Sequence, residues 1–144
     1  MIKFALAPAL ALLASPAFAD GHASGDAAAG EAVFNRQCVA CHIVADADGN
    51  VLAGRNARTG PNLYNMVARG IAADGDFDFG DVIVEFGATG ETWTQEHFVA
   101  YVMDPTGFLR EILDNRRARG KMAFQVRDAG DAADVYAYLA TFAE

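Results

Sequence analysis

The sequence predicts an all-α domain of four or five helices, and two observations lead to that prediction. Several stretches place apolar residues at the 3.6-residue period of an amphipathic helix, and most of them begin at a residue that can cap a helix. No stretch shows the sustained apolar and polar alternation of a half-buried strand, and no internal repeat is present. The length of 144 residues suits one domain preceded by a short leader.

The start of the chain has the features of a cleaved secretory signal. Lys3 supplies a charged start, residues 4–14 form an apolar run, and Ala17-Phe18-Ala19 forms a cleavage site of the A-x-A type. A transmembrane anchor is the alternative, but two prolines and a serine interrupt a stretch already shorter than the roughly 20 apolar residues of a span. We therefore expect residues 1–19 to be removed, which leaves residues 20–144 as one exported, periplasmic domain without stable membrane insertion.

The first predicted helix begins at Asp26, whose carboxylate can cap it, and runs into two cysteines. Its inward side carries four residues at helical spacing: Ala29, Val33, Phe34 and Gln37. Gly30 lies in the middle of this helix, where glycine costs about 1 kcal/mol relative to alanine. That cost is explained if a second helix passes close to Gly30.

Cys38-Val39-Ala40-Cys41-His42 follows directly, and it is the attachment pattern of a c-type haem. On a helix, positions 38 and 41 lie one turn apart on one face, and position 42 projects just past them, where a porphyrin held by both sulfurs places its iron. The motif therefore predicts one covalently attached haem c, bonded to Cys38 and Cys41 and ligated through its iron by His42.

Two alternatives use the same cysteines. A redox-active dithiol of the thioredoxin type has the same spacing, but it needs no histidine after the second cysteine, and no βαβ pattern surrounds this motif. A structural disulfide between Cys38 and Cys41 is the other alternative. The adjacent histidine favours haem attachment over both.

The middle of the chain is predicted to be mostly loop. Residues 45–60 are polar and glycine-rich, and Pro61 permits a short helix ahead of it, at about residues 63–68. Residues 70–91 contain apolar side chains, but glycines and acids interrupt both the helical and the strand period. We expect a long loop there with one helical turn.

Three helices are predicted in the C-terminal half. Thr92 and Gln95 have the spacing of a capping box, and the helix over residues 93–103 ends where Asp104-Pro105 stops it. A short helix is expected at residues 108–113. The last helix starts at Asp131 and carries apolar residues at the 3.6-residue period: Val135, Tyr138, Leu139 and Phe142.

The second iron ligand decides between electron transfer and ligand-binding chemistry. Five side chains could supply it: His22, Met66, His97, Met103 and Met122. Met66 and Met103 lie in apolar helical settings where methionine usually fills space, and His97 has the setting of a surface residue. Met122 follows Gly120 in a loop that can bring the thioether over the ring, so Met122 is favoured.

The charge balance argues against nucleic acid as a partner. The chain has 11 Lys and Arg against 19 Asp and Glu, a formal net charge of −8, whereas neutralising phosphates needs a surplus of bases. The charges are unevenly placed, because residues 70–97 hold seven acids without a base and residues 110–127 hold six bases. One end of the molecule can thus be positive, although two solvated surface runs are the alternative.

The chain as a whole resembles the class I c-type cytochromes, and specifically the cytochrome c2 family of photosynthetic bacteria. The resemblance depends on the order and distances of these pieces: Gly30, Phe34, Cys38–His42, Ala53–Tyr64, Trp93, Asp104-Pro105, Gly120–Met122 and Tyr138-Leu139. It implies four to five helices packed around the haem, with the N- and C-terminal helices crossing. At the crossing, Gly30 and Phe34 are expected to face Val135 and Tyr138.

Carried over residue by residue, the resemblance implies Met122 as the second axial ligand. It also implies that the carbonyl of Pro61 accepts the proton on the far nitrogen of the axial imidazole. Trp93 and Arg69 are expected to approach the haem propionates, and Tyr101 is expected to lie beside the methionine. As an alternative, Trp93 and Tyr101 could simply pack in the core, and Arg69 could be a solvated cation on the surface.

The resemblance implies a monomeric one-electron carrier, not an enzyme, that meets membrane complexes. A cytochrome bc1-type donor and a photosynthetic reaction centre or cytochrome oxidase as acceptor are the expected partners. The alternative is a five-coordinate haem protein that binds a gas or a peroxide, as a sensor does.

We expect a basic docking face on this carrier, with the acids of residues 74–96 turned away from it. The candidate members of the face are Arg55, Arg58, Arg110, Arg116, Arg117, Arg119 and Lys121. Family members usually carry lysines at such positions, whereas Lys121 is the only lysine here after the leader.

Overall fold

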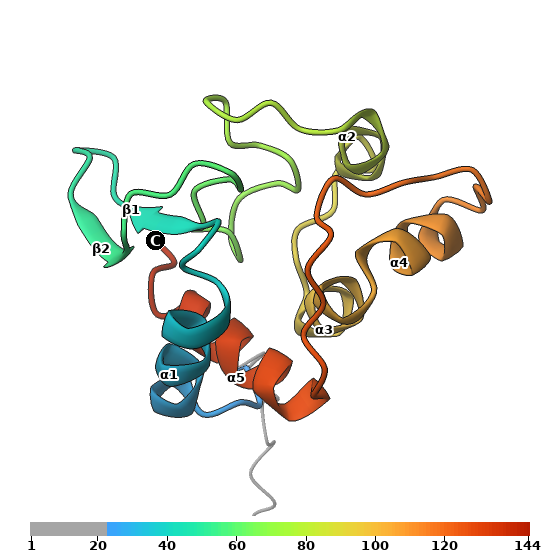
Figure 1. Ribbon diagram of the computed structural model, residues 1–144. Helices are drawn as coiled ribbons and strands as arrows, with labels where there is room; N and C mark the ends of the chain where they lie inside the picture. The colour runs from blue at the N-terminus through green and yellow to red at the C-terminus, as the bar shows by residue number, and fades with distance from the viewer. Residues whose placement is uncertain (1–22) are drawn as a thin grey trace, which may run out of the picture.

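The computed structural model describes residues 23–144, which form five helices and one small sheet (Figure 1). In chain order the elements are α1 (Ala27–Gln37), β1 (Ile43–Ala45), β2 (Val51–Gly54), α2 (Asp81–Gly87), α3 (Gln95–Met103), α4 (Pro105–Ile112) and α5 (Ala129–Ala140). The expected signal over residues 1–19 and the histidine at position 22 lie outside the described residues. Within residues 23–144, no helix has both the length and the apolar character needed to cross a membrane.

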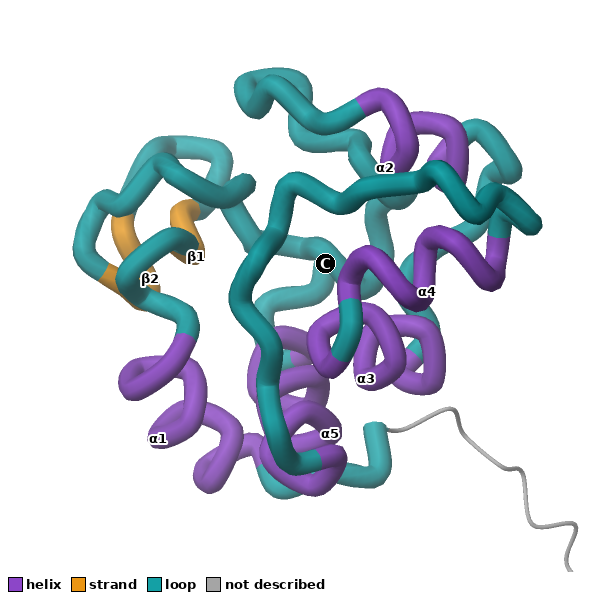
Figure 2. The backbone as a smooth tube through the Cα atoms, turned by 45° about the vertical axis from the view of Figure 1, so that its right-hand side comes forward, coloured by secondary structure: helices purple, strands orange, loops and turns teal. Residues whose placement is uncertain are grey.

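Helices α1 and α5 cross at the base of the molecule (Figures 1 and 2). A β-carbon added at Gly30 would lie 1.9 Å from the carbonyl oxygen of Asp134, so only glycine allows the two backbones this approach. The ring of Phe34, which is fully buried, lies 5.5 Å from that of Tyr138, centroid to centroid. The predicted crossing of the terminal helices is confirmed, and so is the close approach inferred at Gly30.

The prediction of no strand is wrong in one place. β1 and β2 form an antiparallel pair in which Val44 lies opposite Ala53, with an irregularity after Val44. The turn between them is held by the carboxylate of Asp46, which accepts hydrogen bonds from the backbone N–H groups of Asp48 and Asn50 at 3.0 and 2.9 Å. Strands of three and four residues are too short to show an alternating pattern in the sequence.

Two predictions for the middle of the chain also need correction. Residues 64–68 form successive turns rather than the expected short helix, and Asn65 has φ of 53°, a left-handed conformation that a continuous helix cannot contain. Residues 70–91 include helix α2, which is longer than the single turn expected. Phe86 on α2 is 1% exposed, so burial in the core stabilises a helix whose sequence gives no clear period.

The three helices predicted in the C-terminal half are present with shifted starts. The side chain of Thr94, rather than that of Thr92, caps α3, because Thr92 pairs with Gly70 in an isolated bridge. Asp104 ends α3 and caps α4, which begins at Pro105, three residues earlier than expected. Asp128 caps α5, which begins at Ala129, two residues before the expected start at Asp131.

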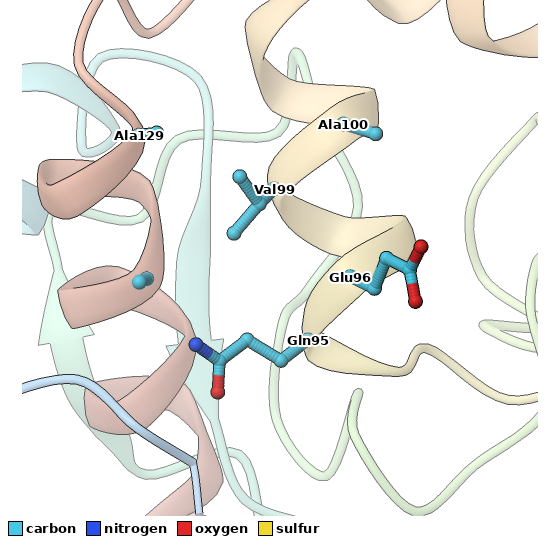
Figure 3. Close-up of a pocket in the computed structure, with 6 residues that line it drawn as sticks. Gln95, Glu96, Val99, Ala100 and Ala129 are labelled. Atoms are coloured by element: carbon cyan, nitrogen blue, oxygen red, sulfur yellow. The ribbon is translucent and has the colours of Figure 1, made fainter.

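Helix α3 also packs along α5 (Figure 3). Val99 and Gln95 on α3 point toward α5, where Ala129 lies on the facing side, and these residues line a shallow, open pocket. Glu96 points away from α5. Glu96 is the one titratable residue among those that line this pocket. A second, larger cavity has several.

Candidate functional site

A cavity of about 620 Å³ lies inside the fold, between two parts of the chain that are far apart in sequence. One wall comes from the end of α1 and the segment after Pro61, and the other from α3 and the segment between α4 and α5. Figure 2 shows that last segment running as a long loop across the molecule before it enters α5. The lining includes all eight residues predicted for the haem and its surroundings, Cys38, Cys41, His42, Pro61, Arg69, Trp93, Tyr101 and Met122.

Cys38 and Cys41 reach the cavity because the chain continues turning after α1. The backbone N–H groups of Cys41 and His42 both donate to the carbonyl of Cys38, at 3.1 and 3.0 Å. Both cysteines are half-buried free thiols in the structure. Burial, together with the nearby Cys41, raises the pKa of Cys38 to about 11. A dithiol catalyst needs a lowered pKa at its attacking thiol, so the site lacks the activation that the thioredoxin-like alternative requires.

The imidazole of His42 is held in one orientation. Its Nδ1 lies 3.0 Å from the carbonyl oxygen of Pro61, and a carbonyl only accepts, so Nδ1 carries the proton. A β-carbon at Gly60 would lie 2.3 Å from Cε1 of the ring, so the ring packs directly against glycine backbone. Burial lowers the pKa of His42, which favours the neutral ring. Nε2 is therefore left as a lone-pair donor, the form in which histidine binds a metal.

The structure narrows the choice of the second iron ligand. Met103 does not line the cavity, and neither does His97, whose ring packs against Phe86 and Phe108 with centroids 5.8 and 5.6 Å apart. Met122 and Met66 both line the cavity. Met66 is 3% exposed and belongs to the segment whose prolyl carbonyl binds His42. Met122 comes from the other wall, which is where a ligand opposite His42 must originate.

Three further predicted residues add polar groups to a mainly apolar lining. Trp93 and Tyr101 pack together with ring centroids 5.0 Å apart, and burial raises the pKa of Tyr101 to about 12, so its hydroxyl stays protonated. Trp93 also packs against Phe86 and Phe108, so it belongs to the core as well as to the cavity wall. Burial lowers the pKa of Arg69, whose guanidinium donates to the carbonyl of Asn62.

The sequence reasoning missed part of the cavity wall. Phe77, Phe79 and Ile83 line the cavity from the stretch that the sequence left unassigned. The sequence feature that could have indicated this wall is the pair of phenylalanines two positions apart, Phe77 and Phe79. In the structure their rings form an edge-on pair with centroids 4.9 Å apart. The sequence reasoning also gave no role to Asn62, which follows Pro61 directly and whose side chain forms hydrogen bonds with the backbone of Ala45 and Tyr64.

The expected separation of acids and bases does not hold at Lys121. Its ammonium lies 2.9 Å from the carboxylate of Asp78 and donates to the carbonyl of Asp78 at 2.7 Å. One acid of residues 74–96 therefore lies against a candidate docking residue instead of away from it. Arg110 is also engaged, because its Nε donates to the carbonyl of Ala118 at 3.0 Å. The remaining candidates are exposed arginines outside the cavity: Arg55, Arg58, Arg116, Arg117 and Arg119.

Comparisons with known proteins agree with this geometry. Residues 25–85 match the family model described as cytochrome C oxidase, cbb3-type, subunit III. Cytochrome c2 of Rhodovulum adriaticum is 51% identical over 118 residues, which is 82% of this chain and 93% of the relative. Cytochrome c2 of Cereibacter sphaeroides is 46% identical over 136 residues, covering 94% of this chain and 91% of the relative.

Solved structures of cytochromes c2 also superpose on this chain. The crystal structure of cytochrome c2 from Rhodobacter sphaeroides superposes with a TM-score of 0.79 at 46% identity, over 83% of this chain and 97% of that one. Cytochrome c2 from Rhodobacter capsulatus superposes with a TM-score of 0.75 at 44% identity, over 81% and 97%. The chain thus shares its fold with these cytochromes c2.

Proposed function

The chain belongs to the cytochrome c2 family, and on this premise we propose that Cys38 and Cys41 bind the haem covalently while His42 and Met122 ligate its iron. The observation that carries the proposal is the placement of His42. The Nδ1–H of a neutral imidazole donates to the carbonyl of Pro61, which leaves Nε2 free to bind a metal, and His42 lines the cavity together with Cys38 and Cys41. Those three groups are what haem attachment requires.

The protein is a one-electron carrier with one covalently attached haem c, and it is not an enzyme. The haem iron supplies the electron-transfer chemistry when bound. The chain contributes the surroundings: an apolar lining that excludes water, a fixed imidazole, and the thioether of Met122 on the opposite wall. An apolar shell and a thioether ligand both favour the reduced state, so we propose a positive midpoint potential.

The five-coordinate sensor is not favoured, because it requires Met122 to stay off the iron. Met122 lines the cavity, and relatives that match over most of the chain include two cytochromes c2. We expect the reduced protein, without any denaturing treatment, to bind carbon monoxide slowly or not at all. Rapid binding of carbon monoxide would instead indicate an open coordination position and contradict the assignment of Met122.

We propose that the carrier works as a monomer in the periplasm and exchanges electrons with membrane complexes. The family resemblance supports a cytochrome bc1-type donor and a photosynthetic reaction centre or a cytochrome oxidase as acceptor. The formal net charge of −8 supports the absence of nucleic acid among the partners.

The proposed docking face includes residues of the segment that carries Met122. Arg119 and Lys121 lie next to it in sequence, and Phe124, 47% exposed, lines the cavity from the same segment. An exposed apolar side chain with cations beside it suits transient contact with an acidic surface. Lys121 contributes less than its position suggests, because Asp78 neutralises it.

Electron exchange with the membrane partners is therefore expected to slow as salt is added. Opposite charges speed the encounter at low ionic strength, and salt screens them, so the second-order rate should fall by roughly tenfold across the accessible range. Asp78→Asn releases Lys121 and should raise the low-salt rate. Glu96→Gln, which changes the charge equally on α3, serves as the control and should have little effect. Rates that do not respond to ionic strength would contradict the docking proposal.

A further inference from the structure

Asn62 joins the segment after Pro61 to the strand that follows His42. Its Oδ1 accepts hydrogen bonds from the backbone N–H groups of Ala45 and Tyr64, both at 3.0 Å, and its Nδ2 donates to the carbonyl of Ala45 at 2.8 Å. The backbones also pair directly, because the N–H of Leu63 donates to the carbonyl of Ile43 at 2.8 Å. One side chain thus ties the two segments that must meet at the imidazole.

The backbone of Asn62 is held at both ends as well. Its N–H donates to Oδ2 of Asp74 at 2.9 Å, and its carbonyl accepts from the guanidinium of Arg69. Every polar group of Asn62 therefore has a partner in the structure. Asp74 belongs to the acid-rich stretch, and it is half-buried, whereas its neighbour Asp76 is exposed.

The contact with Asp74 acts on the same peptide unit as the contact with His42. The carbonyl of Pro61 and the N–H of Asn62 belong to one planar amide, so fixing the N–H also fixes the direction of the carbonyl. A carboxylate at the N–H polarises the amide and makes its carbonyl a stronger acceptor. The geometry links Asp74 to Nδ1 of His42 through one amide: a 2.9 Å contact at one end and a 3.0 Å contact at the other.

We propose that Asp74 is a positioning residue for His42, acting through the amide between Pro61 and Asn62. This inference rests on the proposed ligation of iron by His42. A stronger acceptor at Nδ1–H makes the imidazole more basic, and a more basic ligand stabilises ferric iron. Asp74 thereby lowers the midpoint potential and protects the Nδ1 proton from exchange with water.

The test compares Asp74→Ala with Asp74→Asn in the haem-loaded protein. Both variants remove the same charge, but asparagine keeps an oxygen that can accept from the N–H of Asn62. We expect the Nδ1 proton of His42 in the reduced protein to exchange about fivefold faster in Asp74→Ala, the ratio that corresponds to one lost hydrogen bond. Asp74→Asn should lie between this variant and the wild type, and the midpoint potential should rise more in Asp74→Ala than in Asp74→Asn.

Asp76→Ala, a loss of charge in the same loop without a contact to Asn62, is the control and should leave proton exchange unchanged. Equal exchange rates and equal potentials in the alanine and asparagine variants would overturn the inference, because charge alone would then explain the shift. If the alanine variant does not fold, Asp74→Asn is compared with Asp76→Ala, which removes the same charge from the same loop: faster proton exchange in Asp74→Asn supports the inference, and equal exchange in the two variants overturns it. Absence of imidazole ligation in the wild-type spectrum would overturn the proposed function itself, so the two failures are distinguishable.

Discussion

Replacing Met122 with leucine is expected to leave the haem attached and to lower the midpoint potential by about 0.1–0.2 V, within the roughly 0.8 V range that axial ligation spans. The proposed thioether bonds from Cys38 and Cys41 to the haem do not involve Met122, so the pigment should remain on the chain. Leucine has a similar size but no lone pair, so the iron loses a ligand that favours the reduced state. Redox titration measures the shift, and carbon monoxide binding to the reduced variant should become fast.

Met66→Leu is the matched control for this experiment. Met66 also lines the cavity, but it is nearly buried in the segment that contacts His42. The exchange of methionine for leucine conserves volume, so we expect only a small change in stability and no loss of ligation. If Met66→Leu lowered the potential and Met122→Leu did not, the ligand assignment would be wrong.

Gly30→Ala is expected to reduce the free energy of unfolding by about 2 kcal/mol, although alanine is the better helix former. Helix propensity alone predicts that alanine at this position raises the free energy of unfolding by about 1 kcal/mol. The added methyl group would lie 1.9 Å from the carbonyl oxygen of Asp134 and 2.9 Å from Cβ of Tyr138, so α1 and α5 would have to separate. Denaturant unfolding of the haem-loaded protein measures the sum of the two effects.

Ala32→Gly provides the reverse exchange on the exposed side of the same helix. This substitution should lower the free energy of unfolding by about 1 kcal/mol, because glycine is the poorer helix former and no neighbouring helix contacts an exposed position. A gain in stability from Gly30→Ala would show that the helices accommodate the methyl group, and it would contradict the close crossing of α1 and α5.

The sequence predicted the parts of the site that depend on neighbouring residues. Cys38, Cys41 and His42 lie within five positions, and one turn of chain brings them to the same cavity. The first helix was also predictable, because its cap at Asp26 is a local feature. The glycine at position 30 indicated a close helix neighbour, but which helix it was could be expected only from the family resemblance. The loop position of Met122 favoured it over the other candidates, and the family resemblance implied the same residue.

The parts that the sequence did not predict depend on contacts between distant segments. The role of Asp74 arises from a hydrogen bond to Asn62, twelve positions away across an irregular loop. Thr92 matches a capping box, but pairing with Gly70 removes it from the helix and leaves the cap to Thr94. The pairing of Lys121 with Asp78 spans 43 positions, so charge patterning along the chain could not reveal it.

The central claim is a covalently bound haem ligated by His42 and Met122, and absorption spectroscopy tests it most directly. Protein purified from a host that can attach haem is measured in the oxidised and reduced forms, and again after denaturation. We predict a low-spin c-type spectrum with the weak long-wavelength band of methionine ligation in the oxidised form, and pigment that stays on the denatured chain. A colourless protein with two titratable thiols would contradict the claim.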